Sequence, residues 1–215
     1  MFSPEKTEEL KNAVNEWCED QESALEKYGH ISDWDTSKIT DMSELFANNK
    51  FFNEDLSRWD VSNVTDMRCM FWYAKSFNGD LSLWNVFNVK NMESMFERAS
   101  LFNSDISSWD VSNVTNMRGM FFGAVSFNSN ISNWNVSKVT DMNSMFFIAN
   151  LFNSDLSRWA VSNVKNMRIM FSRAINFKSD LSQWDVSNVE NHCNMFYRAH
   201  SFNNDFAPKF KVPYK

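Results

Sequence analysis

A repeat of 25 residues constrains this chain more than any other feature. One tryptophan marks each repeat, without insertion or deletion, at Trp34, Trp59, Trp84, Trp109, Trp134, Trp159 and Trp184. Methionine follows eight residues later in six of the repeats, and phenylalanine follows twelve residues later in all seven. A fixed period of this length is the signature of a stacked repeat protein, in which each unit packs only against its neighbours. The 215 residues are therefore predicted to form one elongated domain.

The repeat unit combines two kinds of apolar spacing. In the unit that starts at Trp59, positions i, i+3, i+4, i+7 and i+10 are Met67, Met70, Phe71, Ala74 and Phe77. This spacing predicts a short helix that Thr65 or Asp66 caps. Residues 78–80 are Asn, Gly and Asp, and residues 81–86 carry apolar and β-branched side chains at shorter spacing, which predicts a turn followed by a short strand. We therefore expect an α/β solenoid of seven coils over residues 30–206, with a narrow parallel sheet on one side and helices on the other.

The segment before the repeat, residues 1–29, is expected to be a helical cap on the first coil. Its apolar stripe at helical spacing consists of Leu10, Ala13, Val14, Trp17 and Cys18. Ser3 and Pro4 suit the start of the helix, and Gly29 suits its end. A free partner-binding helix is the alternative interpretation.

The segment after the repeat, residues 207–215, is expected to be a C-terminal cap or tail. Its two prolines prevent another coil from forming. Phe210, Val212 and Tyr214 are expected to fold back over the last coil.

Composition and charge exclude several classes of protein. A net charge of −6 argues against a general nucleic-acid or anionic-membrane binder, because phosphate neutralisation needs clustered Lys and Arg. No apolar run approaches the roughly 20 residues that span a bilayer, and the N-terminus lacks the apolar core of a signal peptide. We therefore expect no membrane insertion and a cytoplasmic location. The three cysteines, Cys18, Cys69 and Cys193, do not form a disulfide framework and are expected to be reduced.

Two polar columns raise the question of a metal or catalytic site. One contains Asp55, Asp80, Asp105, Asp155, Asp180 and Asp205, with Asn130 at the remaining position. Asn130 keeps the hydrogen-bonding shape and lacks the charge, which favours a turn-closing role over cation binding along the column. His30, His192 and His200 are scattered, and no phosphate loop or Cys/His ligand spacing is present. We therefore expect no enzyme, no metal site and no cofactor.

Variable positions between constant columns are the candidates for partner binding. Large apolar side chains stand there in some repeats where others carry Glu, Ser or Arg: Trp72, Tyr73, Phe122, Phe147, Ile148 and Tyr197. If exposed, they form a patch typical of protein contacts; the alternative is that the chain turns inward and buries them. A second variable column lies next to the tryptophans, at Arg58, Leu83, Ser108, Asn133, Arg158 and Gln183.

The repeated phrase Trp-Asp-Val-Ser-Asn-Val-Thr-Asp-Met, followed by Met-Phe, Ala, Phe-Asn and Asp-Leu-Ser, resembles a known repeat. It is similar to the 25-residue repeat of Mycoplasma-type surface proteins, a family of unknown function related to BspA-like leucine-rich repeats. The resemblance covers residues 32–206. It implies a right-handed, leucine-rich-repeat-like coil and a role in adhesion or protein contact, and it brings no catalytic residues. The family's bacterial members are usually exported and lipid-anchored, whereas no signal peptide or lipobox cysteine is seen here, which favours a cytoplasmic or virion-associated binder.

The function expected from the sequence is a non-enzymatic module that binds a protein partner through variable surface positions. Two alternatives stay open. One is a structural protein whose coils self-associate, and the other is cation or ligand binding along the Asp column.

Overall fold

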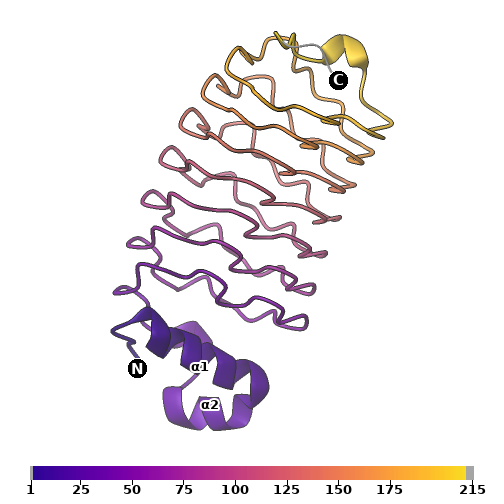
Figure 1. Ribbon diagram of the computed structural model, residues 1–215. Coiled ribbons are helices and arrows are strands. Elements are labelled where there is room, and N and C mark those ends of the chain that lie inside the picture. The colour runs from indigo at the N-terminus through magenta and orange to yellow at the C-terminus, as the bar shows by residue number, and fades with distance from the viewer. Residues whose placement is uncertain (1, 212–215) are drawn as a thin grey trace.

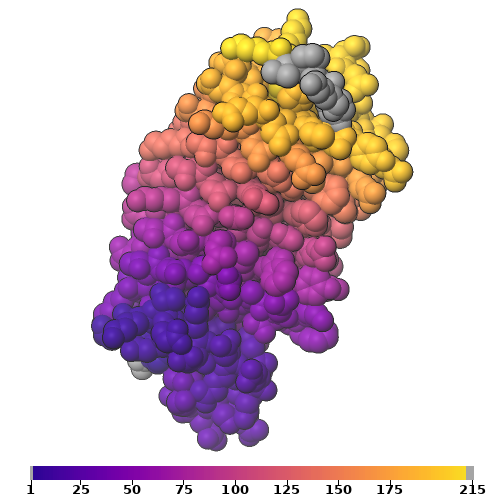
Figure 2. Space-filling model, in the orientation of Figure 1, coloured from indigo at the N-terminus to yellow at the C-terminus, as the bar shows by residue number. Residues whose placement is uncertain are grey.

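The computed structural model describes residues 2–211 and shows a helical N-terminal segment followed by a stack of flat coils (Figure 1). Helix α1 spans Thr7–Glu19 and helix α2 spans Gln21–Tyr28, and two single-turn 3₁₀ helices span Ile31–Asp33 and Asn204–Phe206. Isolated parallel bridges join equivalent residues of successive coils, from Asp41–Asp66 to Asn166–Asn191. The space-filling view shows one elongated body whose colours change in coil order (Figure 2).

The predicted α/β solenoid with a strand and a helix in each coil is wrong. Across residues 2–211 the coils contain no strand longer than a single bridge and no α-helix. The leucine-rich-repeat-like architecture, which needs those elements, is wrong with it. Each coil is instead a series of turns joined by short extended segments.

Left-handed backbone explains why residues 67–77 do not form the expected helix. An α-helix needs a negative φ at every residue, whereas φ is 55° at Cys69 and 60° at Tyr73. The same two positions are left-handed in every coil: Glu44 and Asn48, Ser94 and Arg98, Gly119 and Gly123, Ser144 and Ile148, Ile169 and Arg173, Asn194 and Arg198. Hydrogen bonds between residues three apart close the turns of this segment, as between Met70 and Met67 or Ala74 and Phe71. Apolar side chains therefore recur at nearly the spacing that they have in a helix.

The backbone donors of this segment alternate between two kinds of partner. Met70, Trp72 and Ala74 donate to the carbonyl three residues earlier, at 3.0–3.2 Å. Cys69, Phe71 and Tyr73, which alternate with them, donate to the next coil: the N–H of Cys69 to O of Glu93 at 2.8 Å, that of Phe71 to O of Met95 at 2.9 Å and that of Tyr73 to O of Glu97 at 2.7 Å. An α-helix uses its donors internally and has none left for a neighbour. Alternation therefore gives each coil a row of hydrogen bonds to the next.

The opposite half of each coil, where a strand was expected, is held by side chains. Residues 82–83 and 87–88 are turns, and the N–H of Trp84 donates within the coil to Leu81. The indole Nε1 of Trp84 reaches the previous coil and donates to the carbonyl of Leu56 at 3.0 Å. The Asn53 side-chain oxygen accepts from the N–H of Asn78 at 2.8 Å. Tryptophan and asparagine side chains thus replace much of the backbone ladder that defines a strand.

The core consists of aromatic columns that run through the stack. Trp109 lies 6.4 Å from Trp134 between ring centroids, with an interplanar angle of 1°. Phe96 stacks on Phe102 of its own coil at 3.7 Å and on Phe121 of the next at 5.8 Å. These rings, the methionines and the alanine column are buried. Each coil therefore completes its core only by contact with the coils on either side.

Helix α1 covers the first coil through the stripe that the sequence indicates. Leu10, Ala13, Val14 and Trp17 are buried, and Trp17 meets Trp34 edge to face at 5.9 Å.

The expected helix start at Ser3 and Pro4 is wrong. Helix α1 begins at Thr7 without a side-chain cap, and the Ser3 hydroxyl donates to Asp35 of the first coil at 3.0 Å. Asp20 separates α1 from α2 and accepts from the N–H of Ser23. Gly29, with a φ of 74°, ends α2 as expected.

Part of the expected C-terminal cap is visible. Pro208 is buried, and the half-buried Phe210 stacks on His192 at 3.8 Å between ring centroids. Val212 and Tyr214 lie outside the described residues.

Replacement of a central tryptophan tests the columnar core. Trp109→Ala removes a buried ring and its 2.9 Å hydrogen bond to the Leu81 carbonyl. We expect a loss of about 3–5 kcal/mol in the free energy of unfolding, measured by urea denaturation. Leu83→Ala, at a side chain that is 80 % exposed, is the control and should change stability by less than about 0.5 kcal/mol. Equal losses of stability in Trp109→Ala and Leu83→Ala would contradict a core built from stacked tryptophan rings.

Gly119 tests the left-handed backbone, because its φ is 61°. Gly119→Ala should cost about 1–2 kcal/mol, since a Cβ is disfavoured in this region. The added Cβ would also lie 3.0 Å from the Ser94 hydroxyl. Urea denaturation of Gly119→Ala in a Ser94→Ala background isolates the backbone contribution, and Gly119→Asn should cost less because Asn tolerates this conformation. A neutral Gly119→Ala in both backgrounds would refute the assignment.

Candidate functional site

The positions that vary most in chemistry form one outer edge of the stack, which we call the variable edge. It comprises residues 47–51, 72–76, 97–101, 122–126, 147–151, 172–176 and 197–201. In each coil this segment lies between two core phenylalanines, such as Phe71 and Phe77, and contains one buried alanine or, in the first coil, Asn49. Its other side chains point outward from the turn and are half-buried or exposed. One exception is Ser172, which is buried.

The binding residues predicted from sequence all lie on the variable edge, in three groups. Phe122, Phe147 and Ile148 come from adjacent coils, and the two phenylalanine rings are 4.8 Å apart. Trp72 and Tyr73 form a second group with ring centroids 6.2 Å apart, separated from the first by the coil that carries Glu97 and Arg98.

Tyr197 makes up the third group and lies in the last coil. It is exposed, whereas the other five predicted residues are half-buried. The expected patch is therefore partly sunk into the surface.

Sequence reasoning missed the most exposed apolar residues of the edge. Phe51 is 91 % exposed, Leu101 57 % and Leu151 52 %, and Ile175 is also exposed. The signal was an alternation along the column of Phe51, Leu101 and Leu151, in which serine stands at 76 and 126 between these large residues. Ile175 belongs to the neighbouring column.

The variable edge is basic, although the whole protein is acidic. It carries five cations, Lys50, Lys75, Arg98, Arg173 and Arg198, against one carboxylate, Glu97. Glu97 accepts a hydrogen bond from Ser94 at 2.7 Å. Among residues 2–211, the five ion pairs all lie elsewhere, between Lys27 and Glu16, Lys38 and Glu5, Arg58 and Asp33, Arg68 and Glu44, and Arg118 and Glu93.

Aromatic rings position several of these cations. The Lys75 ammonium lies 4.6 Å from the centre of the Tyr73 ring, and it lowers the pKa of that phenol through a hydrogen bond and its charge. The Arg98 guanidinium lies 5.6 Å from the Phe122 ring. Such contacts hold a cation in place without using its hydrogen-bond donors. The Arg98 guanidinium therefore keeps its donors for a carboxylate or phosphate, and the Lys75 ammonium keeps those that it does not give to the Tyr73 hydroxyl.

A hollow of about 360 Å³ lies at the N-terminal end of the variable edge, between the helices and the first coil. Its walls are Trp17, Cys18, Gln21, Asn48, Asn49, Lys50, Phe51, Phe52 and Glu54. Burial, aided by Glu19 and Glu54, raises the pKa of the Cys18 thiol to about 11. The thiol is therefore protonated at neutral pH and is a poor nucleophile.

The second variable column has a different character. Leu83 is 80 % exposed, but Arg58 is occupied in an ion pair with Asp33 at 3.1 Å. The other positions of that column carry Ser, Asn, Arg and Gln. It offers a single apolar contact and serves as a control surface.

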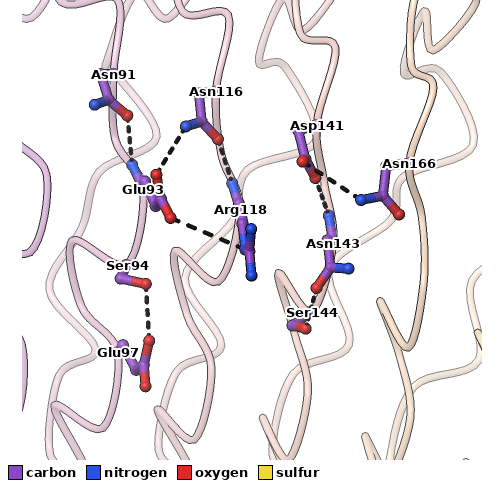
Figure 3. A network of polar contacts seen from close by, with 10 residues as sticks. All are labelled: Asn91, Glu93, Ser94, Glu97, Asn116, Arg118, Asp141, Asn143, Ser144 and Asn166. Carbon is purple, nitrogen blue, oxygen red and sulfur yellow. Dashed lines mark hydrogen bonds and ion pairs between the residues drawn. The ribbon is translucent and has the colours of Figure 1, made fainter.

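A polar network lies where the bridges join the coils (Figure 3). The Asn116 side-chain oxygen accepts from the N–H of Arg118 at 3.0 Å, and its amide donates to Glu93 at 3.1 Å. Asp141 likewise accepts from the N–H of Asn143 at 2.7 Å. These side chains close turns and cross-link coils.

The turn-closing role predicted for the Asp column is confirmed by hydrogen bonds at every position except Asp205, which lies in the 3₁₀ helix Asn204–Phe206. Asp105 accepts from the N–H of Ser107 at 2.9 Å, and Asn130 makes the same bond to Ser132 at 3.0 Å. The Ser107 hydroxyl and then its N–H lower the pKa of Asp105. Within the described part of the chain, no three His, Cys, Asp or Glu side chains come together as metal ligands.

Comparison with known proteins identifies a family without a known activity. The model of a family described as "Mycoplasma protein of unknown function, DUF285" matches residues 10–129 and 102–210. Neither the curated proteins nor the solved structures contain a match. No helix in residues 2–211 has the length and apolar character needed to cross a membrane.

Asp105 tests the turn-closing role and its dependence on pH. Asp105→Ala should lose about 1 kcal/mol of stability at pH 7, whereas Asp105→Asn should keep most of it, as Asn130 does. The folded-state pKa of Asp105 is lowered, so its contribution is complete above the unfolded pKa of about 3.9 and is lost as pH falls through the folded value. Thermal denaturation between neutral and acidic pH should show a shallower acid loss for Asp105→Asn than for the wild type.

Proposed function

Since the chain belongs to this DUF285 family of unknown function, we propose from its geometry that it is a non-enzymatic module that binds a protein partner through the variable edge. The observation that carries the proposal is a row of exposed apolar side chains, led by Phe51, Leu101 and Leu151, on a well-connected scaffold. Large apolar residues on a surface are a common mark of protein contacts.

The scaffold supports this role because it fixes the relative positions of the edge residues. The backbone N–H of Tyr73 donates to the carbonyl of Glu97 in the next coil, and the backbone N–H of Arg98 donates to the carbonyl of Phe122 at 2.6 Å. Edge residues of successive coils are thus connected through the backbone itself. A partner meets a surface that needs little ordering on binding, which reduces the entropic cost of association.

Other observations favour binding over chemistry. The part of the chain that the structure describes holds no cluster of three His, Cys, Asp or Glu side chains, and the Cys18 thiol is protonated. The Asp carboxylates accept hydrogen bonds within their own turns, which weakens the case for cations along that column. A cytoplasmic or virion-associated location stays a prediction from the sequence.

A pull-down with two matched variants tests the proposal. Tagged wild-type protein, an edge variant with Phe51→Ser, Leu101→Ser and Leu151→Ser, and a control with Leu83→Ser and Phe87→Ser, two exposed side chains outside the edge, are incubated with lysate of cells that express the protein. Circular dichroism and urea denaturation first establish that each variant folds. We expect partners that the wild type and the control retain and the edge variant loses, by at least about tenfold in recovered amount, as for loss of central contact residues.

The reverse pattern would overturn the proposal. Partners lost only by the Leu83 and Phe87 control would place binding on the tryptophan side of the coil. If the wild type captures nothing and sedimentation shows large assemblies, the structural alternative of self-association is favoured instead.

A further inference from the structure

We infer that the partner presents an acidic segment to the variable edge, in which carboxylates stand beside large apolar side chains. This inference rests on the proposed function and specifies the chemistry of the partner. Four features of the edge support it: its charge, the spacing of its cations, its exposed aliphatic side chains and the hollow at its helical end.

The charge of the edge is opposite to that of the molecule. Five cations and one carboxylate lie on it, in a protein of net charge −6. Arg98, Arg173 and Arg198 occupy one position of the repeat and are exposed, and none of the edge cations belongs to an ion pair within residues 2–211. Complementary charge across an interface selects the partner and accelerates association.

The spacing of the cations suits an extended segment. Lys75 and Arg198 lie five coils apart, which is roughly 25 Å at the usual spacing of stacked chains. An extended peptide of about eight residues covers that distance. Rings hold four of the cations in place: Tyr73 for Lys50 and Lys75, Phe122 for Arg98, and Tyr197 for Arg198.

The apolar residues between the cations favour protein over nucleic acid. Leu101, Leu151 and Ile175 are exposed aliphatic side chains. Single-stranded nucleic acids need flat aromatic platforms for their bases, whereas aliphatic side chains pack against apolar residues of a protein. The Phe122 and Phe147 rings are tilted by 55° to each other, so they do not form one continuous platform.

The hollow at the helical end gives such a segment an anchor. Lys50 and Phe51 belong both to the variable edge and to the wall of the hollow, so the two are continuous. The volume of about 360 Å³ is at the small end of ligand pockets and accepts a large apolar side chain. Trp17 and Phe52 supply apolar wall, and Asn49 stands where later coils have a buried alanine.

Peptide display with charge-reversed variants tests the inference without a known partner. The edge variant carries Lys75→Glu, Arg98→Glu and Arg173→Glu. The control carries Lys90→Glu, Lys138→Glu and Lys165→Glu, at exposed positions outside the edge, and changes the net charge equally. Glu44 already occupies a left-handed position with a φ of 62°, so glutamate suits the backbone of Arg98 and Arg173.

A library of random peptides is selected against the wild type, and the enriched peptides are then measured by fluorescence anisotropy. We expect enriched sequences that combine Asp or Glu with Leu, Ile or Phe. Their Kd should rise at least about tenfold in the edge variant and stay within about twofold in the control. It should also rise when salt increases from about 50 mM to about 500 mM, because salt screens charge pairs.

Several outcomes would overturn the inference. Enrichment of neutral or basic peptides, equal loss in both variants, or no enrichment would each do so. Peptides that bind the edge without dependence on salt or on the three cations would leave the proposed function standing and refute only the acidic partner. Tighter binding of single-stranded DNA than of any peptide would assign the edge to nucleic acid.

A second copy of the chain is the remaining competitor. Helix α2 carries Glu22 and Glu26 beside the exposed Leu25, an acidic and apolar surface within this chain. Sedimentation of the wild type that shows concentration-dependent oligomers, dispersed by the edge variant and not by the control, would replace an external partner with self-association.

Discussion

The left-handed backbone at two positions of every coil determines how this molecule is held together. It turns alternate peptide groups, so that N–H groups such as those of Cys69 and Tyr73 leave their own turn and donate to the next coil. Non-glycine residues pay about 1–2 kcal/mol for this conformation, and only the coil with Gly119 and Gly123 avoids that cost. Hydrogen bonds and burial between coils offset it, which makes the stack cooperative.

The aromatic columns and the side-chain hydrogen bonds depend on this register. Because successive coils are related by 25 residues, identical rings meet face to face, as Trp109 and Trp134 do. The asparagine column uses the same register, and each side-chain oxygen accepts from the N–H of its successor up to Lys178. Lysine has no acceptor, so this row of bonds ends there, and Asn203 instead accepts from the N–H of Asp205.

The sequence predicts the periodicity and the buried positions far better than the backbone. Burial of Met67, Phe71 and Ala74 follows directly from the constant columns. The prediction of a helix was wrong because three-residue turns give nearly the same apolar spacing as a helix. In addition, a left-handed φ leaves no sequence signal when residues as different as Glu44, Cys69 and Ile169 adopt it. The prediction of a strand was wrong because indole and amide side chains make the hydrogen bonds between coils that a strand would make with its backbone.

The candidate site was predictable in position and only partly in content. Variation between coils located the edge, since residues outside the core are free to differ. Exposure was not predictable, because it depends on where each turn points: Phe122 is half-buried, whereas Phe51 is almost fully exposed. The basic character of the edge emerged only when residues 25 positions apart were placed side by side.

Uniform contacts between coils also have a consequence for how such a chain can change. Each coil offers its successor nearly the same donors, acceptors and rings, so gain or loss of one 25-residue unit would rejoin matching surfaces. The length of the edge can therefore grow or shrink in steps of one coil, while the helical end stays as it is. Among relatives built this way, the reach of the surface becomes a trait that duplication or deletion can alter independently of the fold.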